Sequence, residues 1–158
     1  MAKSTPKQTA PLIDEDSLWK VSVGAHHDPH SILGAHQFAG GVVIRSYKPM
    51  AKKVVAQLSG GLEVPLEHLS NGIWQGTLTS KEIPDYRVLA SFDDGNEWLV
   101  DDPYHYLPTI GELDLHLIRE GRHEELWKAL GSHLHSVSGS LGESAGVRFA
   151  VWAPNAQA

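Results

Sequence analysis

The sequence predicts a mainly β protein, an antiparallel β-sandwich with short helices at its start and a helical connector after its strands. Between residues 40 and 100, apolar and polar residues alternate in short runs rich in β-branched and aromatic side chains, the pattern of half-buried strands. Turn-forming pairs such as Gly60-Gly61 and Asn71-Gly72 separate these runs. Because this region offers no helix that could cross over between parallel strands, we expect its strands to pair antiparallel.

The composition bounds the class of protein. The chain has 158 residues, 41% of them hydrophobic, and no apolar run approaches the roughly 20 residues of a membrane helix. Its net charge is -6 and its lysines and arginines do not cluster, which argues against a nucleic-acid partner. The absence of cysteine excludes disulfides and thiolate metal sites and agrees with a reducing compartment. We therefore expect a soluble, cytoplasmic protein with neither a membrane nor a nucleic-acid partner.

The amino-terminal part is expected to begin with a disordered tail. Residues 1–11 are mostly polar, lack the apolar stretch of a secretory signal, and cannot bury enough apolar surface to become ordered. Acidic residues ahead of an apolar run predict a short helix over residues 14–23. In residues 26–36, Pro29 suits the first position of a single helical turn that ends at Gly34.

Four histidines crowd this turn: His26, His27, His30 and His36. A zinc site usually needs a third protein ligand in register and a second shell that orients each imidazole, and this spacing matches no known ligand pattern. We interpret the turn as solvated or as a cap on the core, and we predict neither a metal site nor a cofactor.

Six short runs are the predicted strands, and the helical connector follows them. The strands cover residues 42–47, 53–58, 62–66, 73–78, 86–92 and 97–100. In the connector, residues 111–120 and 124–130 carry apolar side chains at helical spacing, and Gly121 separates the two short helices. Acidic residues in their first turns suit the exposed amide groups of a helix start, so we interpret them as caps and not as catalysts.

After the connector the chain becomes dense in Ser and Gly, so residues 136–146 are typical of a flexible linker. The last residues begin a strand that is apolar on both faces, and such a strand is normally covered from both sides. The predicted organisation is a disordered tail over residues 1–11, a β-sandwich module with its helical connector over 12–133, a linker over 134–145, and the first strand of a truncated second β-module over 146–158.

Four motifs follow one another along the chain. They are Asp28-Pro29 with Leu33-Gly34-Ala35-His36, then Asp102-Pro103-Tyr104, then Gly111-Glu112-Leu113-Asp114-Leu115 with Glu120-Gly121, and finally Val147-Arg148-Phe149-Ala150-Val151-Trp152-Ala153-Pro154-Asn155-Ala156. From about Ala25 to the end, the chain closely resembles the amino-terminal region of bacterial 1,4-α-glucan (glycogen) branching enzymes. The final motif is also shared with debranching and trehalose-forming enzymes, whereas the first and third motifs are more specific.

The resemblance implies a larger enzyme, a retaining glycosyltransferase of the α-amylase superfamily. Such an enzyme cuts an α-1,4-glucan and passes the segment to a 6-hydroxyl, using an aspartate nucleophile and a glutamate acid/base on a (β/α)₈ barrel. This chain would supply an immunoglobulin-like, carbohydrate-binding-module-like first module and the opening of a second one. Its implied partners are α-1,4-glucan or glycogen and the downstream domains of the parent enzyme.

No catalytic residue is expected in this chain, which should be inactive alone. The adjacent pairs Asp93-Asp94 and Asp101-Asp102 do not change this expectation, because neighbours on an extended strand point to opposite faces. A glycosidase needs two carboxyl groups that face each other across a sugar-sized gap. Turn and cap roles explain both pairs.

Sugar recognition is the remaining chemistry, since the C–H faces of glucose stack on exposed aromatic rings. The candidate glucan-binding residues are Trp74, Trp98, Tyr104 and Tyr106. Each has a structural alternative. Trp74 shares a strand face with Leu78 and suits the core, and Trp98 alternates with Leu99. Tyr104, beside Pro103, could staple the connector to the sandwich.

Two classes of function remain open. The first is the amino-terminal module of a branching enzyme, which positions glucan and influences the length of the transferred segment. The second is a stand-alone, non-catalytic module that binds α-glucan or docks other domains, or the equivalent part of a debranching or trehalose-forming enzyme.

Overall fold

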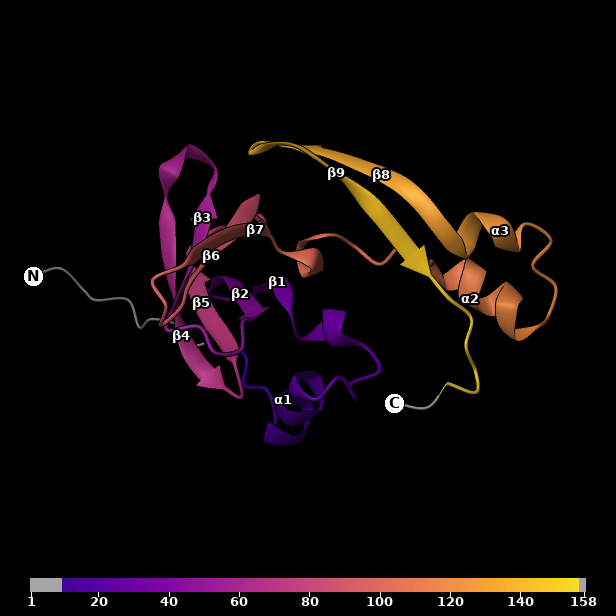
Figure 1. The fold of residues 1–158 in the computed structure, drawn as a ribbon, viewed down its shortest axis with the longest axis horizontal. Helices are drawn as coiled ribbons and strands as arrows, with labels where there is room; N and C mark the ends of the chain where they lie inside the picture. The colour runs from indigo at the N-terminus through magenta and orange to yellow at the C-terminus, as the bar shows by residue number, and fades with distance from the viewer. Residues whose placement is uncertain (1–9, 157–158) are drawn as a thin grey trace, which may run out of the picture. The chain divides into compact units, whose positions relative to one another are not determined.

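The computed structural model describes residues 10–156, which divide into two compact units, each with its own sheet (Figure 1). The first unit extends to Tyr106 and the second begins at Leu107. Within the described residues, no helix is both long enough and apolar enough to cross a membrane.

The first unit is one curled antiparallel sheet of seven strands with short helices around it. Its strands lie in the order β1-β2-β5-β4-β3-β6-β7. The first half of β4 pairs with β3 and its second half pairs with β5, so the sheet folds over at β4 into two layers. This confirms the predicted mainly β, antiparallel sandwich. In chain order the elements are α1 (Glu15–Ser22), η1 (Pro29–Ser31), β1 (Gly34–Phe38), β2 (Gly41–Tyr47), β3 (Lys53–Leu58), η2 (Ser59–Gly61), β4 (Glu63–Ser70), β5 (Ile73–Leu78), β6 (Tyr86–Ser91), β7 (Glu97–Asp101) and η3 (Pro103–His105).

The two layers bury one apolar core between them. Alternate residues of neighbouring strands point inward, among them Val42 and Ile44 of β2 and Val54 and Ala56 of β3, none more than 1% exposed. Each fully buried Val or Ile side chain stabilises the fold by about 1.5–3 kcal/mol, so these alternating strands account for the stability of the sheet.

Helix α1 covers the outer face of one layer. The Asp14 carboxylate accepts a hydrogen bond from the Ser17 N–H at 2.8 Å, which caps the helix. Leu18 and Val21 pack against Ile73 of β5 in a second apolar cluster. The helix predicted over residues 14–23 is therefore confirmed.

In the first unit, β1 is the strand that the sequence pattern did not predict. Its residues (GAHQF) include no β-branched side chain, and Gly34 looks like the end of a turn. Gly34 instead opens the strand with a φ of 92°, and a Cβ there would lie 2.4 Å from the Tyr104 carbonyl oxygen. Only glycine allows this approach. The six predicted strands are all present, and β4 continues to Ser70, beyond its predicted end.

The second unit contains α2 (Glu112–Arg119), α3 (Leu126–Ala129), β8 (Gly131–Gly139) and β9 (Gly142–Ala150). Both connector helices are confirmed, and they lie in the unit of the hairpin, whereas the sequence placed them with the module of residues 12–133. The linker prediction is wrong, because residues 134–145 belong to the antiparallel hairpin of β8 and β9. A ladder of backbone hydrogen bonds needs no apolar alternation, so the Ser and Gly composition concealed it.

Candidate functional site

Trp98 is the candidate aromatic residue that is most open to solvent. It lies on β7, an edge strand of the sheet, and 62% of its surface is exposed. Its partner across the ladder is Ala90, a core residue, so the indole stands on the inner face of the sheet at its open edge. An exposed indole held by a strand is a suitable platform for the C–H face of a sugar ring.

Trp74 lies in the core and is only 8% exposed. Its Nε1 donates a hydrogen bond to the Lys48 carbonyl oxygen at 3.1 Å, and its ring meets His68 edge-on with the centroids 5.2 Å apart. A buried indole whose N–H is already satisfied offers no face to a sugar, so this geometry supports the core alternative.

Tyr104 and Tyr106 are half-buried residues at the end of the first unit. The Tyr104 ring packs edge-on against His30 with the centroids 4.9 Å apart, and the Tyr106 carbonyl oxygen lies 3.2 Å from His30 Nε2. Both tyrosines therefore join the η3 region to η1, which supports a stapling role. Across residues 10–156, no ring contact connects these tyrosines to Trp98 or Trp74.

Asp102 anchors a buried network at this staple. Its side chain is 1% exposed and accepts hydrogen bonds from the Tyr86 hydroxyl and the Tyr104 N–H, each at 3.1 Å. Burial raises the pKa of Asp102 above 3.8, although these two hydrogen bonds lower it, and burial also raises the pKa of Tyr86. The His105 ring lies edge-on to the Tyr86 ring with the centroids 4.8 Å apart, and His105 Nε2 is 3.3 Å from Asp85 Oδ1. The network locks the turn, and its one signal in the sequence is the motif Asp102-Pro103-Tyr104.

The adjacent aspartates have separate partners. Asp94 accepts hydrogen bonds from the N–H and the side-chain amide of Asn96, at 3.0 and 2.6 Å, which lower the pKa of Asp94 below 3.8. The ion-pair partner of Asp93 is Lys52 at 3.1 Å, and that of Asp101 is Arg87 at 2.7 Å. These contacts belong to turns, caps and ion pairs, and not to a facing pair of carboxyl groups.

The histidines of the early turn make different kinds of contact. His26 and His27 stack with their centroids 5.1 Å apart, and His36 Nε2 lies 3.0 Å from the Leu33 carbonyl oxygen. Among the residues that the structure describes, no three His, Asp or Glu side chains are grouped so that they could hold a metal ion.

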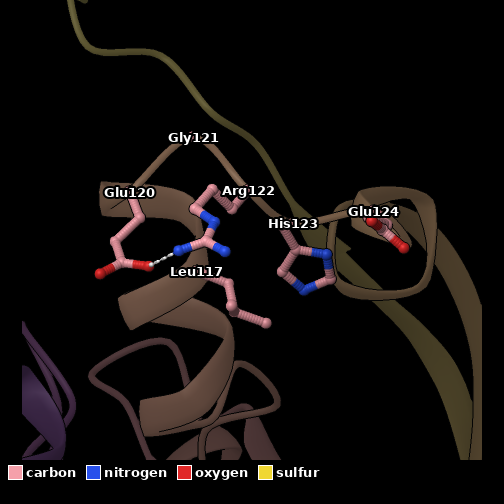
Figure 2. A pocket seen from close by; sticks show the side chains of 6 residues that line it. All are labelled: Leu117, Glu120, Gly121, Arg122, His123 and Glu124. Atoms are coloured by element: carbon pink, nitrogen blue, oxygen red, sulfur yellow. Dashed lines mark ion pairs between the residues drawn. The ribbon is translucent and has the colours of Figure 1, made fainter.

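An open hollow of about 570 Å³ lies at the end of α2 in the second unit (Figure 2). Figure 2 shows Glu120 and Arg122 beside each other, and Arg122 Nη1 is 3.6 Å from Glu120 Oε2. His123 Nε2 lies 2.9 Å from Asp114 Oδ1, and this hydrogen bond lowers the pKa of Asp114 below 3.8. The hollow is polar, of mixed charge, and lacks a Trp or Tyr ring on which a sugar could stack. Its lining residues are Leu117, Glu120, Gly121, Arg122, His123 and Glu124.

Comparisons with known proteins identify the family of this chain. Residues 14–104, nearly the whole first unit, match the family model of the alpha-1,4-glucan branching enzyme GlgB N-terminal domain. The chain is 48% identical over 152 residues to the 1,4-alpha-glucan branching enzyme GlgB of Thermobifida fusca, which covers 96% of this chain and 20% of that protein. It is 47% identical over 148 residues to 1,4-alpha-glucan branching enzyme GlgB 1 of Streptomyces coelicolor, and this alignment covers 94% of this chain and 18% of that protein. With the 1,4-alpha-glucan branching enzyme GlgB of Rhodococcus jostii the identity is 45% over 157 residues, and this alignment covers 99% of this chain and 21% of that protein.

This chain spans about a fifth of the length of these relatives. The likeness extends through both units, because it covers nearly all of the chain. With the family model matching more than half of its residues, the chain belongs to the family of α-1,4-glucan branching enzyme GlgB N-terminal domains.

Proposed function

We propose that this chain is the amino-terminal region of a glycogen branching enzyme and that its first unit positions α-glucan for the transfer reaction. Family membership supports the first part of the proposal. The observation that carries the second part is Trp98, an indole that is 62% exposed at the edge of a folded sheet.

The proposed role follows from the reaction. A branching enzyme must select how long a glucan segment to move, but a catalytic site contacts only the few sugars near the cut. A rigid sheet that holds a more distant part of the glucan can provide this selection, because binding energy from remote contacts serves to position the reacting centre. The chemistry itself would belong to the catalytic part of the parent enzyme.

Sugar binding is tested by titrating the chain with maltoheptaose while following backbone amide shifts by NMR. Trp98→Ala removes the ring on which the sugar would stack. This variant should bind maltoheptaose about tenfold more weakly, which corresponds to about 1.4 kcal/mol of binding free energy. The matched control is Trp19→Ala, since Trp19 is also exposed, at 53%, but lies on α1. Equal affinities of both variants and the original chain would exclude Trp98 from the binding surface.

Segment selection is tested in the full-length enzyme by deleting residues 1–106. The deletion should shift the branch-length distribution of the product, measured by chromatography after enzymatic debranching. An unchanged distribution from a folded, active deletion variant would favour the second candidate, a module that only docks other domains. The observation that favours this second candidate is Leu99, an apolar residue beside Trp98 that is 49% exposed.

A further inference from the structure

The hairpin turn ahead of Trp98 has a fixed backbone. Its loop is Asp93-Asp94-Gly95, where the Gly95 N–H donates a hydrogen bond to the Phe92 carbonyl oxygen at 3.1 Å and Gly95 has a φ of 80°. The Phe92 N–H donates to the Asn96 carbonyl oxygen at 3.0 Å. This arrangement is a type I turn closed by a left-handed glycine, a common connection between two antiparallel strands. The hydrogen bonds between β6 and β7 therefore continue as far as Asn96.

Asn96 lies on the same face of the sheet as Trp98. Residues two apart on a strand point to one side, and the register shows no shift between Asn96 and the pair formed by Ala90 and Trp98. Phe92, opposite Asn96, packs against the core as Ala90 does, so this is the inner face of the sheet. Two residues along a strand measure about 7 Å. The Asn96 amide is therefore within reach of the hydroxyl groups of a sugar stacked on the indole.

Asp94 holds the side chain of Asn96 in place. Asn96 Nδ2 donates a hydrogen bond to Asp94 Oδ2 at 2.6 Å, and the Asn96 N–H donates to Asp94 Oδ1 at 3.0 Å. These two bonds lower the pKa of Asp94 below 3.8, so its carboxylate remains charged at neutral pH. A side chain that is already held loses less rotamer freedom when a ligand binds. Within residues 10–156, Asn96 Oδ1 and the second N–H of the amide have no further hydrogen-bond partner.

Other polar side chains of this hairpin are already engaged. Asp93 forms an ion pair with Lys52 at 3.1 Å. Glu97 accepts a hydrogen bond from the Ser91 hydroxyl at 2.8 Å, and it points to the opposite face from Trp98 because it is the adjacent residue. Asn96 thus offers a ligand on the inner face both a hydrogen-bond donor and an acceptor.

A planar amide suits two adjacent hydroxyl groups. Each hydroxyl group can donate and accept, so one can donate to Oδ1 while its neighbour accepts from the N–H. The linkages of an α-1,4-glucan use C1 and C4 of each glucose unit, and a branch uses C6. The hydroxyl groups at C2 and C3 remain as an adjacent pair. Sugar sites usually combine an aromatic face with a few placed polar groups.

We propose that Asn96 is the specificity-determining residue of the glucan site at Trp98, and that its amide binds the C2 and C3 hydroxyl groups of the glucose unit stacked on the indole. This inference rests on the proposed function. Asp94 is a positioning residue, which fixes the Asn96 amide without touching the sugar. The site therefore favours glucans in which both hydroxyl groups are free over glucans that are linked through one of them.

NMR of the 158-residue chain tests the contact directly. During titration with maltotetraose, the Asn96 side-chain amide and the Trp98 indole N–H should shift along one saturation curve. Asn96→Ala should weaken binding about fivefold, because two hydrogen bonds to the sugar are lost. Asp94→Ala should weaken it about threefold, because the amide is no longer held. The matched control is Glu97→Gln, on the opposite face, which should leave the affinity unchanged.

A second ligand tests the selectivity. In a glucose tetramer with α-1,3 links, the C3 hydroxyl group is used by the linkage in every unit except the terminal one. The original chain should bind the α-1,4 tetramer about fivefold more tightly than the α-1,3 tetramer. Asn96→Ala should bind both tetramers with similar affinity, because the group that distinguishes them is absent.

The outcomes separate this inference from the proposed function. A shift of the Trp98 indole without a shift of the Asn96 amide would overturn the role of Asn96 and leave Trp98 as a sugar platform. So would an Asn96→Ala variant that keeps the full preference for the α-1,4 tetramer. If the Trp98 indole does not shift in a chain that circular dichroism shows to be folded, the proposed glucan site is wrong and this inference is wrong with it.

Discussion

Asp102 is a residue whose environment makes stability depend on pH. Burial raises its pKa above 3.8, so the folded protein retains this proton to higher pH than the unfolded chain. The stabilisation from the protonated carboxyl group is complete at low pH and is lost as the pH rises through the raised pKa. In Asp102→Asn the amide can still bond to Tyr86 and Tyr104, but it does not titrate.

The first prediction concerns this variant. The free energy of unfolding of the original chain, minus that of Asp102→Asn, should decrease as the pH rises above 3.8 and then level off. Urea unfolding of both proteins from about pH 3 to 7 measures the difference. A difference that stays constant over this range would mean that Asp102 titrates alike in the folded and unfolded states.

Gly34 is the residue with the least tolerance of a side chain. Gly34→Ala is unfavourable for two reasons. The φ of Gly34 is 92°, and an added Cβ would lie only 2.4 Å from the Tyr104 carbonyl oxygen. We expect this substitution to lower the free energy of unfolding by about 3 kcal/mol. The matched control is Gly60→Ala, where φ is 81° but nothing lies within 4 Å, and only about 1 kcal/mol should be lost. Equal losses in urea unfolding would show that the Tyr104 backbone yields.

At the scale of elements, α1 and α2 each have 8 residues and are each followed by a left-handed glycine, Gly24 and Gly121, but they bury different amounts of apolar surface. Leu18→Ala removes a side chain that is 4% exposed and should cost about 3 kcal/mol of unfolding free energy. Leu115, the fourth residue of α2 as Leu18 is of α1, is 37% exposed, so Leu115→Ala should cost about 1 kcal/mol or less. Chemical denaturation followed by circular dichroism compares the two, and similar costs would show that α2 is already covered as well as α1.

For the whole molecule, we expect no branching activity from the chain alone. Asp94 accepts a hydrogen bond within a turn, and Asp93 and Asp101 form ion pairs with Lys52 and Arg87. A retaining transfer instead needs two facing carboxyl groups. Incubation with amylose should leave the iodine stain unchanged, while a full-length branching enzyme in parallel should reduce it. A loss of stain that a substitution in this chain removes would contradict this expectation.

The whole molecule divides at an earlier residue than the sequence pattern predicts. By sequence pattern alone, the helical connector completes the module of residues 12–133. In the structure the second unit begins at Leu107, so α2 and α3 belong to it. The sequence carries a sign of this division, because Leu33-Gly34-Ala35-His36 at the start of β1 is similar to Leu130-Gly131-Ser132-His133 at the start of β8.

The sequence by itself determined the strands β2, β3, β5, β6 and β7, the helices and the family, because alternation, caps and motifs are local properties of the chain. It also supplied the four aromatic candidates, but it could not rank them. Burial depends on which strands become neighbours, and only the tertiary structure decided that Trp74 lies in the core while Trp98 stands at an open edge. The same limit applies to β1 and to the Asp102 network, since each depends on partners that are distant in sequence, Tyr104 over Gly34 and Tyr86 beside Asp102. The hairpin of β8 and β9 is local, and it was missed because its Ser and Gly residues lack the apolar alternation of a strand.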